Sequence, residues 1–236
     1  MPADKFLFYP NTEYAVTVQW ETEEAYPKIL LLRDFLEKYP FDGYIESVPT
    51  FTTLTIYFDP LLLFRNITHN DRLQWLREYL EMGCERSVAS GKTVPGRLVE
   101  VPVCYGGYLG PDLKWACEKT QLGEETFVEL HGAAVYQVYM LGFVPGFPYM
   151  GFVPELIQLP RLQQARSKVA AGSIGIAGRQ TGIYPSAIPG GWPLIGRTPV
   201  RIYRPETDIP FLIKAGDRVR FRPISHEEFL DTNEYL

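Results

Sequence analysis

The chain begins with short segments whose apolar positions repeat with different periods. Residues 14–20, YAVTVQW, alternate apolar and polar side chains as a half-buried strand does. In the next segment, 23–40, Ile29, Leu32 and Leu36 are three and four positions apart, which predicts an amphipathic helix. The change of period within thirty residues indicates a mixed α and β unit.

Two further strands and a second helix are predicted next. Residues 43–49 and 51–60 are rich in β-branched and aromatic side chains and are separated by a proline turn, so they predict two strands. Residues 70–84, which begin with an Asn or Asp cap, predict a second amphipathic helix. A strand at 97–105, RLVEVPVCY, would complete the order β-α-β-β-α-β, which is typical of a ferredoxin-like α/β sandwich.

The pattern changes in the second part of the chain. Residues 142–200 contain ten of the twenty glycines and eight of the twenty prolines. Short strands between Gly and Pro turns predict a closed or nearly closed β-barrel after one helical interval at 110–132. The predicted domains are therefore 1–94 and 95–236. The β-rich pieces of the second domain are 135–143, 168–178, 193–203 and 218–225.

One segment fits neither period. Residues 142–161, GFVPGFPYMGFVPELIQLPR, hold three glycines, four prolines and four aromatic residues. Proline fixes φ and glycine permits close backbone approach, so the segment is expected to form an ordered wall of a ligand pocket.

Composition excludes several classes of protein. Of the 236 residues 46% are apolar and 22% charged, which predicts a globular chain that can bury a core. The net charge of −5 predicts no nucleic-acid partner. No leader and no apolar run of membrane-spanning length is visible, and three cysteines without paired spacing predict reduced thiols and no metal site. We expect a soluble, cytoplasmic protein.

No familiar catalytic motif is present. The tetrapeptide SGKT at 90–93 resembles the end of a phosphate-binding P-loop, but Arg86 stands where that motif needs glycine. The sequence around Ser173 is not a GxSxG elbow, and HExxH and GxGxxG are absent. We therefore expect no nucleotide site in this chain.

The local charge between 142 and 200 differs from that of the rest of the chain. The segment carries +4, while the whole chain carries −5 and the remainder therefore −9. Arginine presents a planar fork of donors that matches carboxylate or phosphate, so an anionic ligand is one interpretation. Scattered solvent-facing arginines are the other. The basic residues are Arg161, Arg166, Lys168, Arg179 and Arg197, against Glu155 alone.

Three other features have both a structural and a functional interpretation. Gly190 and Gly191, followed by Trp192, allow a turn that presents backbone N–H groups to an anion, or a plain barrel corner. Asp112 is expected to cap the helix that begins near residue 113, with a role in a site as the alternative. His131 is expected near a helix C-terminus, where the dipole favours its charged form and a structural role as a capping or core residue, with a general acid or base as the alternative.

Several long motifs together resemble one family. The run GPDL…LH…VYMLGFVPGFPYMGFVPELIQLPR…R…GSIGIAGRQTGIYP…PGGWPLIGRTP is similar to the family of the B-type 5-oxoprolinase subunit, also called KipI or allophanate hydrolase subunit 1. The stretch GYIESVPTFTTLTIYFDP resembles the second and third strands of the same family. The resemblance covers essentially the whole chain.

The resemblance implies a ferredoxin-like domain followed by a cyclophilin-like barrel. It implies a subunit, inactive alone, of an ATP-dependent complex that opens 5-oxo-L-proline to L-glutamate, with partners of the C type (KipA) and the A type (LamB/YcsF). ATP would act in the complex and not bind this chain. The alternatives are a KipI-type inhibitor of a histidine kinase and a subunit of an allophanate or urea-type amide hydrolase system.

The resemblance also implies a pocket shared with a partner. This chain departs from the family pattern at Ala165, Ala170 and Ile188, of which Ile188 bears on ligand identity. The implied ligand-binding residues are Asp112, His131, Gly146, Phe147, Tyr149, Arg166, Gln180, Pro189, Gly190, Gly191, Trp192, Arg197 and Thr198.

Overall fold

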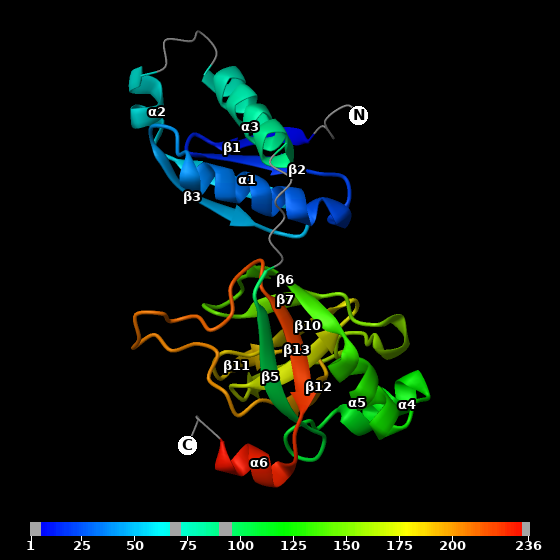
Figure 1. Cartoon of the computed structure of the whole chain (residues 1–236). Coiled ribbons are helices and arrows are strands. Elements are labelled where there is room, and N and C mark those ends of the chain that lie inside the picture. The colour runs from blue at the N-terminus through cyan, green and yellow to red at the C-terminus, as the bar shows by residue number, and fades with distance from the viewer. Residues whose placement is uncertain (1–5, 67–71, 90–95, 233–236) are drawn as a thin grey trace. The chain divides into compact units, whose positions relative to one another are not determined.

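A computed structural model describes residues 6–66, 72–89 and 96–232. The chain divides into two compact units, Met1–Pro95 and Gly96–Leu236 (Figure 1). The predicted helix cap at Asn70 or Asp71 and the SGKT tetrapeptide with its surrounding linker lie outside the described residues.

The N-terminal unit is a four-stranded antiparallel sheet in the order β1-β2-β4-β3 with helices (Figure 1). Strand β4 lies within the predicted strand 51–60, and its side chains alternate between half-buried and buried. Its elements are β1 (Leu7–Thr12), β2 (Ala15–Gln19), η1 (Glu23–Ala25), α1 (Tyr26–Lys38), β3 (Tyr44–Pro49), β4 (Thr53–Phe58), α2 (Pro60–Asn66) and α3 (Arg72–Ala89).

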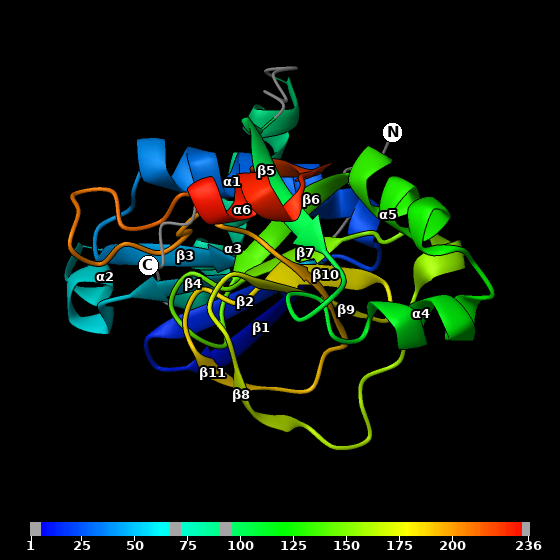
Figure 2. The same ribbon diagram turned by 90° about the horizontal axis from the view of Figure 1, so that it is seen from below.

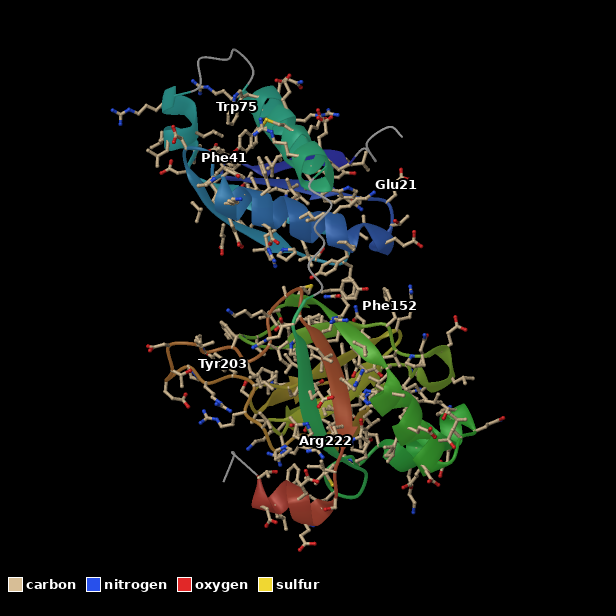
Figure 3. The ribbon with its side chains drawn as sticks, in the orientation of Figure 1. Glu21, Phe41, Trp75, Phe152, Tyr203 and Arg222 are labelled. Carbon is tan, nitrogen blue, oxygen red and sulfur yellow. The ribbon has the colours of Figure 1, made fainter. Side chains whose placement is uncertain are left out.

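The helices of this unit are held by apolar contacts. Helix α1 buries Ile29, Leu32 and Leu36, the residues whose spacing predicts it, and it packs on β3, β4 and α3. Gly83 lets α3 approach closely, because a Cβ there would lie 2.7 Å from Cδ1 of Phe35. Phe41 meets Trp75 of α3 edge-on, with ring centroids 6.2 Å apart (Figure 3).

The C-terminal unit is a closed barrel in the order β10-β7-β6-β13-β5-β12-β9, with a separate two-stranded sheet of β8 and β11. Its strands are β5 (Leu98–Tyr105), β6 (Val135–Leu141), β7 (Pro148–Gly151), β8 (Arg166–Val169), β9 (Ser173–Ala177), β10 (Gln180–Ile183), β11 (Ile188–Gly190), β12 (Leu194–Arg197) and β13 (Arg218–Pro223). Its helices are α4 (Leu113–Thr120), α5 (Glu124–Ala133), η2 (Glu155–Ile157) and α6 (His226–Asp231).

The expected last strand of the N-terminal sheet belongs to the barrel. Strand β5 pairs in parallel with β13, from Leu98 opposite Arg218 to Val103 opposite Pro223, and pairs antiparallel with β12. The fourth strand of the first sheet is instead β1, which lies beside β2 and is not predicted from the sequence. That part of the prediction is wrong, because an alternating strand fits the edge of any sheet and only its partners decide between them.

Two other predictions need correction. The segment 142–161 contains a strand, β7, which pairs with β6 and β10. The single helical interval is two helices, because Gln121 ends α4 in the left-handed region at φ 57°. Helices α4 and α5 contact each other beside the barrel, and α6 contacts β5 (Figures 1 and 2).

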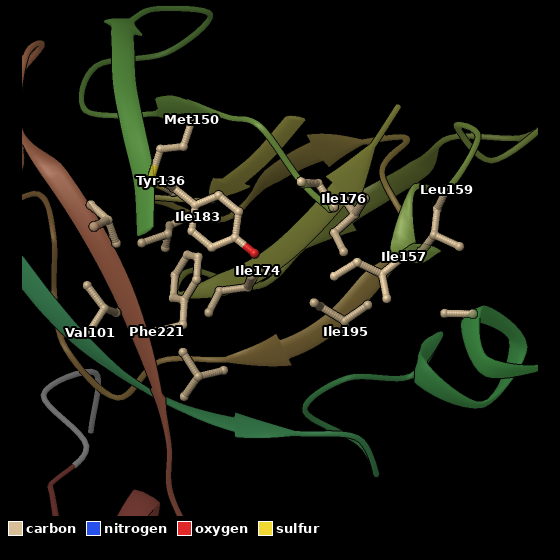
Figure 4. Close-up of a cluster of buried hydrophobic side chains, with 14 of the residues drawn as sticks. Val101, Tyr136, Met150, Ile157, Leu159, Ile174, Ile176, Ile183, Ile195 and Phe221 are labelled. Atoms are coloured by element: carbon tan, nitrogen blue, oxygen red, sulfur yellow. The ribbon is translucent and has the colours of Figure 1, made fainter. Parts of the chain in front are cut away.

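Aliphatic side chains from most strands fill the barrel. Figure 4 shows Ile174, Ile176, Ile183 and Ile195 around the ring of Tyr136. Strand β9 is buried at every position, in keeping with its small and apolar sequence SIGIA. The barrel is therefore a packed core, and a ligand site is expected at its outer loops.

Candidate functional site

An ion pair between Arg166 and Asp112 lies at the centre of the candidate site. Nη2 of Arg166 donates to Oδ1 of Asp112 over 2.7 Å. Oδ2 of Asp112 accepts the backbone N–H of Leu194 at 2.6 Å, and Asp112 donates its own N–H to the Leu194 carbonyl at 2.9 Å. Both carboxylate oxygens are thereby in use.

The expected helix cap at Asp112 is wrong. The residue stands at the N-cap position of α4, but its side chain makes no capping hydrogen bond. A buried carboxylate is stabilised more by a guanidinium than by a second backbone amide, and Asp112 is 9% exposed. The functional alternative, in which Asp112 belongs to a site, agrees with this geometry.

The two terminal nitrogens of the Arg166 guanidinium differ in their hydrogen bonding. Its other terminal nitrogen, Nη1, is buried and has no hydrogen-bond partner in the described part of the chain. A buried donor without an acceptor is unfavourable by about 1–3 kcal/mol. Since the arginine fork matches two acceptor oxygens, Nη1 is suited to an anionic group that the chain itself does not supply.

Strand pairing brings the Gly190–Trp192 turn beside this arginine. In the β8–β11 sheet Gly190 lies opposite Arg166. The carbonyl of Gly191 accepts the N–H of Leu162 at 2.8 Å, which ties the turn to the segment before β8. The stretches that contain Asp112, Arg166 and the Gly190–Trp192 turn therefore meet here.

Aromatic rings pack next to the turn. Phe147 is the central ring, 2% exposed, with centroids 5.5 Å from Trp192 and 4.8 Å from Tyr149. Tyr149 and Trp192 also meet at 6.0 Å. Burial raises the pKa of Tyr149, with Arg161 acting in the opposite direction, so its phenol is neutral near pH 7. We call these three rings the aromatic cluster.

Gly146, directly before Phe147 of the aromatic cluster, allows the backbone to approach Tyr203 closely. Gly146 has φ +82°, a region that favours glycine, and a Cβ there would lie 3.1 Å from Cβ of Tyr203. Tyr203 stacks on Phe211 with centroids 5.3 Å apart. Gly146 therefore lies against the Tyr203–Phe211 stack.

Arg197 and Thr198 lie at a second turn, residues 171–173. Nε of Arg197 donates to the carbonyl of Ala171 at 2.7 Å. The N–H of Thr198 donates to the carbonyl of Gly172 at 2.9 Å, and its buried hydroxyl accepts the N–H of Val200 at 3.2 Å. The side chain of Arg197 and the backbone of Thr198 therefore hold the second turn.

His131 lies in the barrel core, in keeping with the expected structural role, but the expectation of a charged histidine is wrong. The ring is fully buried and stacks on Phe221 with centroids 4.7 Å apart. Burial lowers the pKa of His131 to about 3. Desolvation outweighs the helix dipole here, because the side chains that bind the ring in the described part of the chain, Tyr105 and Thr181, are neutral.

The hydrogen bonds of His131 define its tautomer. The hydroxyl of Thr181 donates to the carbonyl of Gly175 at 3.1 Å, so it accepts from Nε2 of His131 at 3.2 Å. Nδ1 then accepts the hydroxyl of Tyr105 at 2.8 Å. A neutral ring with its hydrogen on Nε2 satisfies both contacts, so this residue belongs to the polar network of the barrel core.

The remaining predicted site residues occupy strands beside the site. Gln180 is half-buried at the start of β10, opposite Gly151 and Ala177. Pro189 is exposed in β11, one position before Gly190. The sequence analysis assigned no role to Tyr184, which contacts Phe147 with ring centroids 5.3 Å apart. Its place in the motif GIYP is the one signal that could have drawn attention to it.

The described residues contain neither a metal cluster nor a membrane-spanning helix. They hold no group of three or more His, Cys, Asp or Glu side chains that could bind a metal ion. Within 6–66, 72–89 and 96–232, no helix combines the length and the apolar character needed to cross a bilayer.

The sequence and the fold match those of a known class of domain. Residues 6–213 match the family model described as carboxyltransferase domain, subdomain C and D. The crystal structure of TTHA0988 is 35% identical with a TM-score of 0.73, covering 90% of this chain and 40% of that one. The Pyrococcus horikoshii protein PH0987 is 35% identical with a TM-score of 0.55, covering 94% of this chain and 100% of that one. Urea amidolyase of K. lactis, at 17% identity and a TM-score of 0.72 over 98% of this chain and 16% of that one, shows likeness of fold alone.

Sequence relatives specify the family. The B-type 5-oxoprolinase subunit of Bacillus subtilis (strain 168) is 41% identical over 199 residues, 83% of this chain and 82% of that protein. The protein of the same name from Escherichia coli O157:H7 is 50% identical over 127 residues, 54% of this chain and 58% of that protein. The chain belongs to the family of B-type 5-oxoprolinase subunits.

Proposed function

We propose that this chain is a subunit, inactive alone, of a cytoplasmic ATP-dependent 5-oxoprolinase that converts 5-oxo-L-proline to L-glutamate. The observation that supports it most is 41% identity across 83% of the chain to the B-type 5-oxoprolinase subunit of Bacillus subtilis. The letter B in the name of that protein indicates further subunits. We take these partners to be of the C type (KipA) and the A type (LamB/YcsF).

In the reaction, this chain would hold the carboxylate of the substrate. Nη1 of Arg166 is a buried donor with no acceptor among the described residues, and Nη2 is fixed by Asp112. A carboxylate oxygen would complete the fork, and the ring of a small cyclic acid would pack on the aromatic cluster. An amide is a poor electrophile and needs activation by ATP, which we assign to a partner subunit.

The lengths of structural relatives are in keeping with a shared site. This chain corresponds to 40% of TTHA0988, 23% of the Kluyveromyces lactis urea carboxylase and 16% of the urea amidolyase. In each case the same fold is one part of a longer chain. A single unit that has its partner in a separate subunit is the arrangement we propose here.

Reconstitution tests the function. The chain is combined with the two partner subunits, and glutamate release from 5-oxoproline and ATP is measured. Turnover should require all three subunits, and unchanged turnover without this chain would contradict the proposal.

A variant of Arg166 tests the carboxylate site. Arg166→Lys keeps one charge for Asp112 but loses the second nitrogen, so kcat/KM should fall about 10–100-fold. Arg220→Lys, at an exposed pair with Glu100, is the matched control and should keep activity.

A KipI-type inhibitor of a histidine kinase is the second candidate. Kinase docking would leave the free nitrogen of Arg166 unexplained, so we rank it below the enzyme subunit. Tight binding to the purified kinase without other subunits, together with reduced autophosphorylation, would reverse this order.

We also interpret the two units as variants of known folds. In the chain, α1 lies between β2 and β3, and in the sheet, β4 lies between the same two strands. This arrangement is a split βαβ unit. This supports a ferredoxin-like N-terminal unit in which β1 replaces the usual final strand. The closed barrel supports the cyclophilin-like interpretation of the second unit.

A further inference from the structure

Tyr184, one residue after β10, lies beneath the Gly190–Trp192 turn. Its side chain is 2% exposed, and its ring meets Phe147 edge-on at 82°. The phenol oxygen accepts a hydrogen bond from the backbone N–H of Trp192. A Cβ at Gly190 would clash with the same oxygen, so the turn can rest on the phenol only with glycine there.

The backbone of Tyr184 is held by the second turn. Its N–H donates to the carbonyl of Ser173 at 2.9 Å, and its carbonyl accepts the N–H of Gly172 at 2.7 Å. Gly172 in turn accepts the N–H of Thr198 at 2.9 Å. Tyr184 therefore stands between the turn beside Arg166 and the turn braced by Arg197.

The electrostatic surroundings keep the phenol neutral. Burial raises the pKa of Tyr184, while the Trp192 amide and the charges of Arg161 and Arg166 act in the opposite direction. The arginines are thus near enough to influence this hydroxyl. A neutral, buried phenol that accepts one backbone hydrogen bond is suited to hold a turn and not to exchange protons.

We propose that Tyr184 is a positioning residue, which holds the Gly190–Trp192 turn in the conformation that keeps Arg166 directed at its anionic ligand. The link to Arg166 is the β8–β11 pairing, in which Gly190 lies opposite the arginine. The part of this inference that concerns the ligand of Arg166 rests on the proposed function. The contact between Tyr184 and the turn does not depend on it.

The first test measures the contact alone. Tyr184→Phe removes the hydroxyl and keeps the ring. Tyr136→Phe is the matched control, because Tyr136 is a fully buried tyrosine whose hydroxyl donates to one backbone carbonyl, that of His131, at 2.9 Å. Amide hydrogen exchange at Trp192 in the full chain should be about tenfold faster in Tyr184→Phe, as expected for one lost hydrogen bond, and unchanged in Tyr136→Phe.

The second test measures positioning in the reconstituted complex. Tyr184→Phe should raise KM for 5-oxoproline about tenfold with kcat within about twofold, while Tyr136→Phe should match the wild type. Unchanged exchange at Trp192, or faster exchange with an unchanged KM, would overturn the proposal. If the wild-type complex shows no turnover, the proposed function has failed, and exchange at Trp192 still decides whether Tyr184 holds the turn.

Discussion

Arg166 and Asp112 are 54 positions apart in the sequence and are joined by a hydrogen-bonded ion pair of 2.7 Å. The carboxylate of Asp112 also binds the backbone of Leu194, at the start of β12. One acidic side chain thus links α4, β8 and the barrel wall, and it leaves one guanidinium nitrogen for a ligand.

Asp112→Ala should destabilise the protein well beyond the loss of a surface ion pair. It leaves the half-buried guanidinium of Arg166 and the N–H of Leu194 without their acceptor, so the free energy of unfolding should fall by about 2–4 kcal/mol. Urea unfolding at neutral pH measures this. Glu81→Ala, at the exposed Arg77–Glu81 pair of α3, should change it by less than about 0.5 kcal/mol. Similar losses in the two variants would contradict the structural role of Asp112.

His131 should make stability depend on pH. Its pKa falls from 6.5 to about 3 on folding, so the unfolded chain binds the extra proton first as pH drops. The stability that belongs to the neutral ring is therefore complete above pH 6.5 and is lost as pH falls toward 3. The slope is about 1.4 kcal/mol for each pH unit within this window.

The variant His131→Gln isolates this effect. Its unfolding free energy should vary less between pH 6.5 and 5 than that of the wild type. Phe127→Leu, at another fully buried position, should lower stability equally at every pH. Equal slopes in wild type and His131→Gln would show that the histidine is not buried in its neutral form.

Gly146→Ala should be more damaging than Gly178→Ala. Both glycines have positive φ, +82° and +57°, so alanine is strained by about 1 kcal/mol at either position. Only at Gly146 would the new Cβ also press on Tyr203, at 3.1 Å, whereas nothing lies within 4 Å at Gly178. Thermal unfolding should show the larger loss, about 2 kcal/mol or more, at Gly146. Equal losses would mean that the Tyr203 contact is absent.

Truncation tests the place of β5. A fragment of residues 96–236 contains every strand of the barrel and should unfold cooperatively. A fragment of residues 106–236 lacks β5, which exposes the edges of β12 and β13, and it should not fold. Circular dichroism during heating distinguishes the two. Cooperative unfolding of the shorter fragment would show that β5 is not part of the barrel core.

Local patterns in the sequence were enough for much of the fold. The spacing of Ile29, Leu32 and Leu36 predicts α1, because the helix period decides which side chains share a face. The β-branched and aromatic residues of 51–60 predict β4. The Gly and Pro density predicts a barrel of short strands. The long motifs around PGGW pointed to the correct family.

Long-range contacts decided the rest. Whether β5 joins the first sheet or the barrel depends on β13, which lies more than a hundred residues away. Asp112 has the same local sequence whether it caps a helix or binds Arg166, and His131 has the same neighbours in sequence whether its ring faces water or the core. The order of residues along the chain specifies the helix and strand periods and the family. Which donor meets which acceptor, and which ring loses its water, depends on segments that folding brings together, so neither can be read from local sequence.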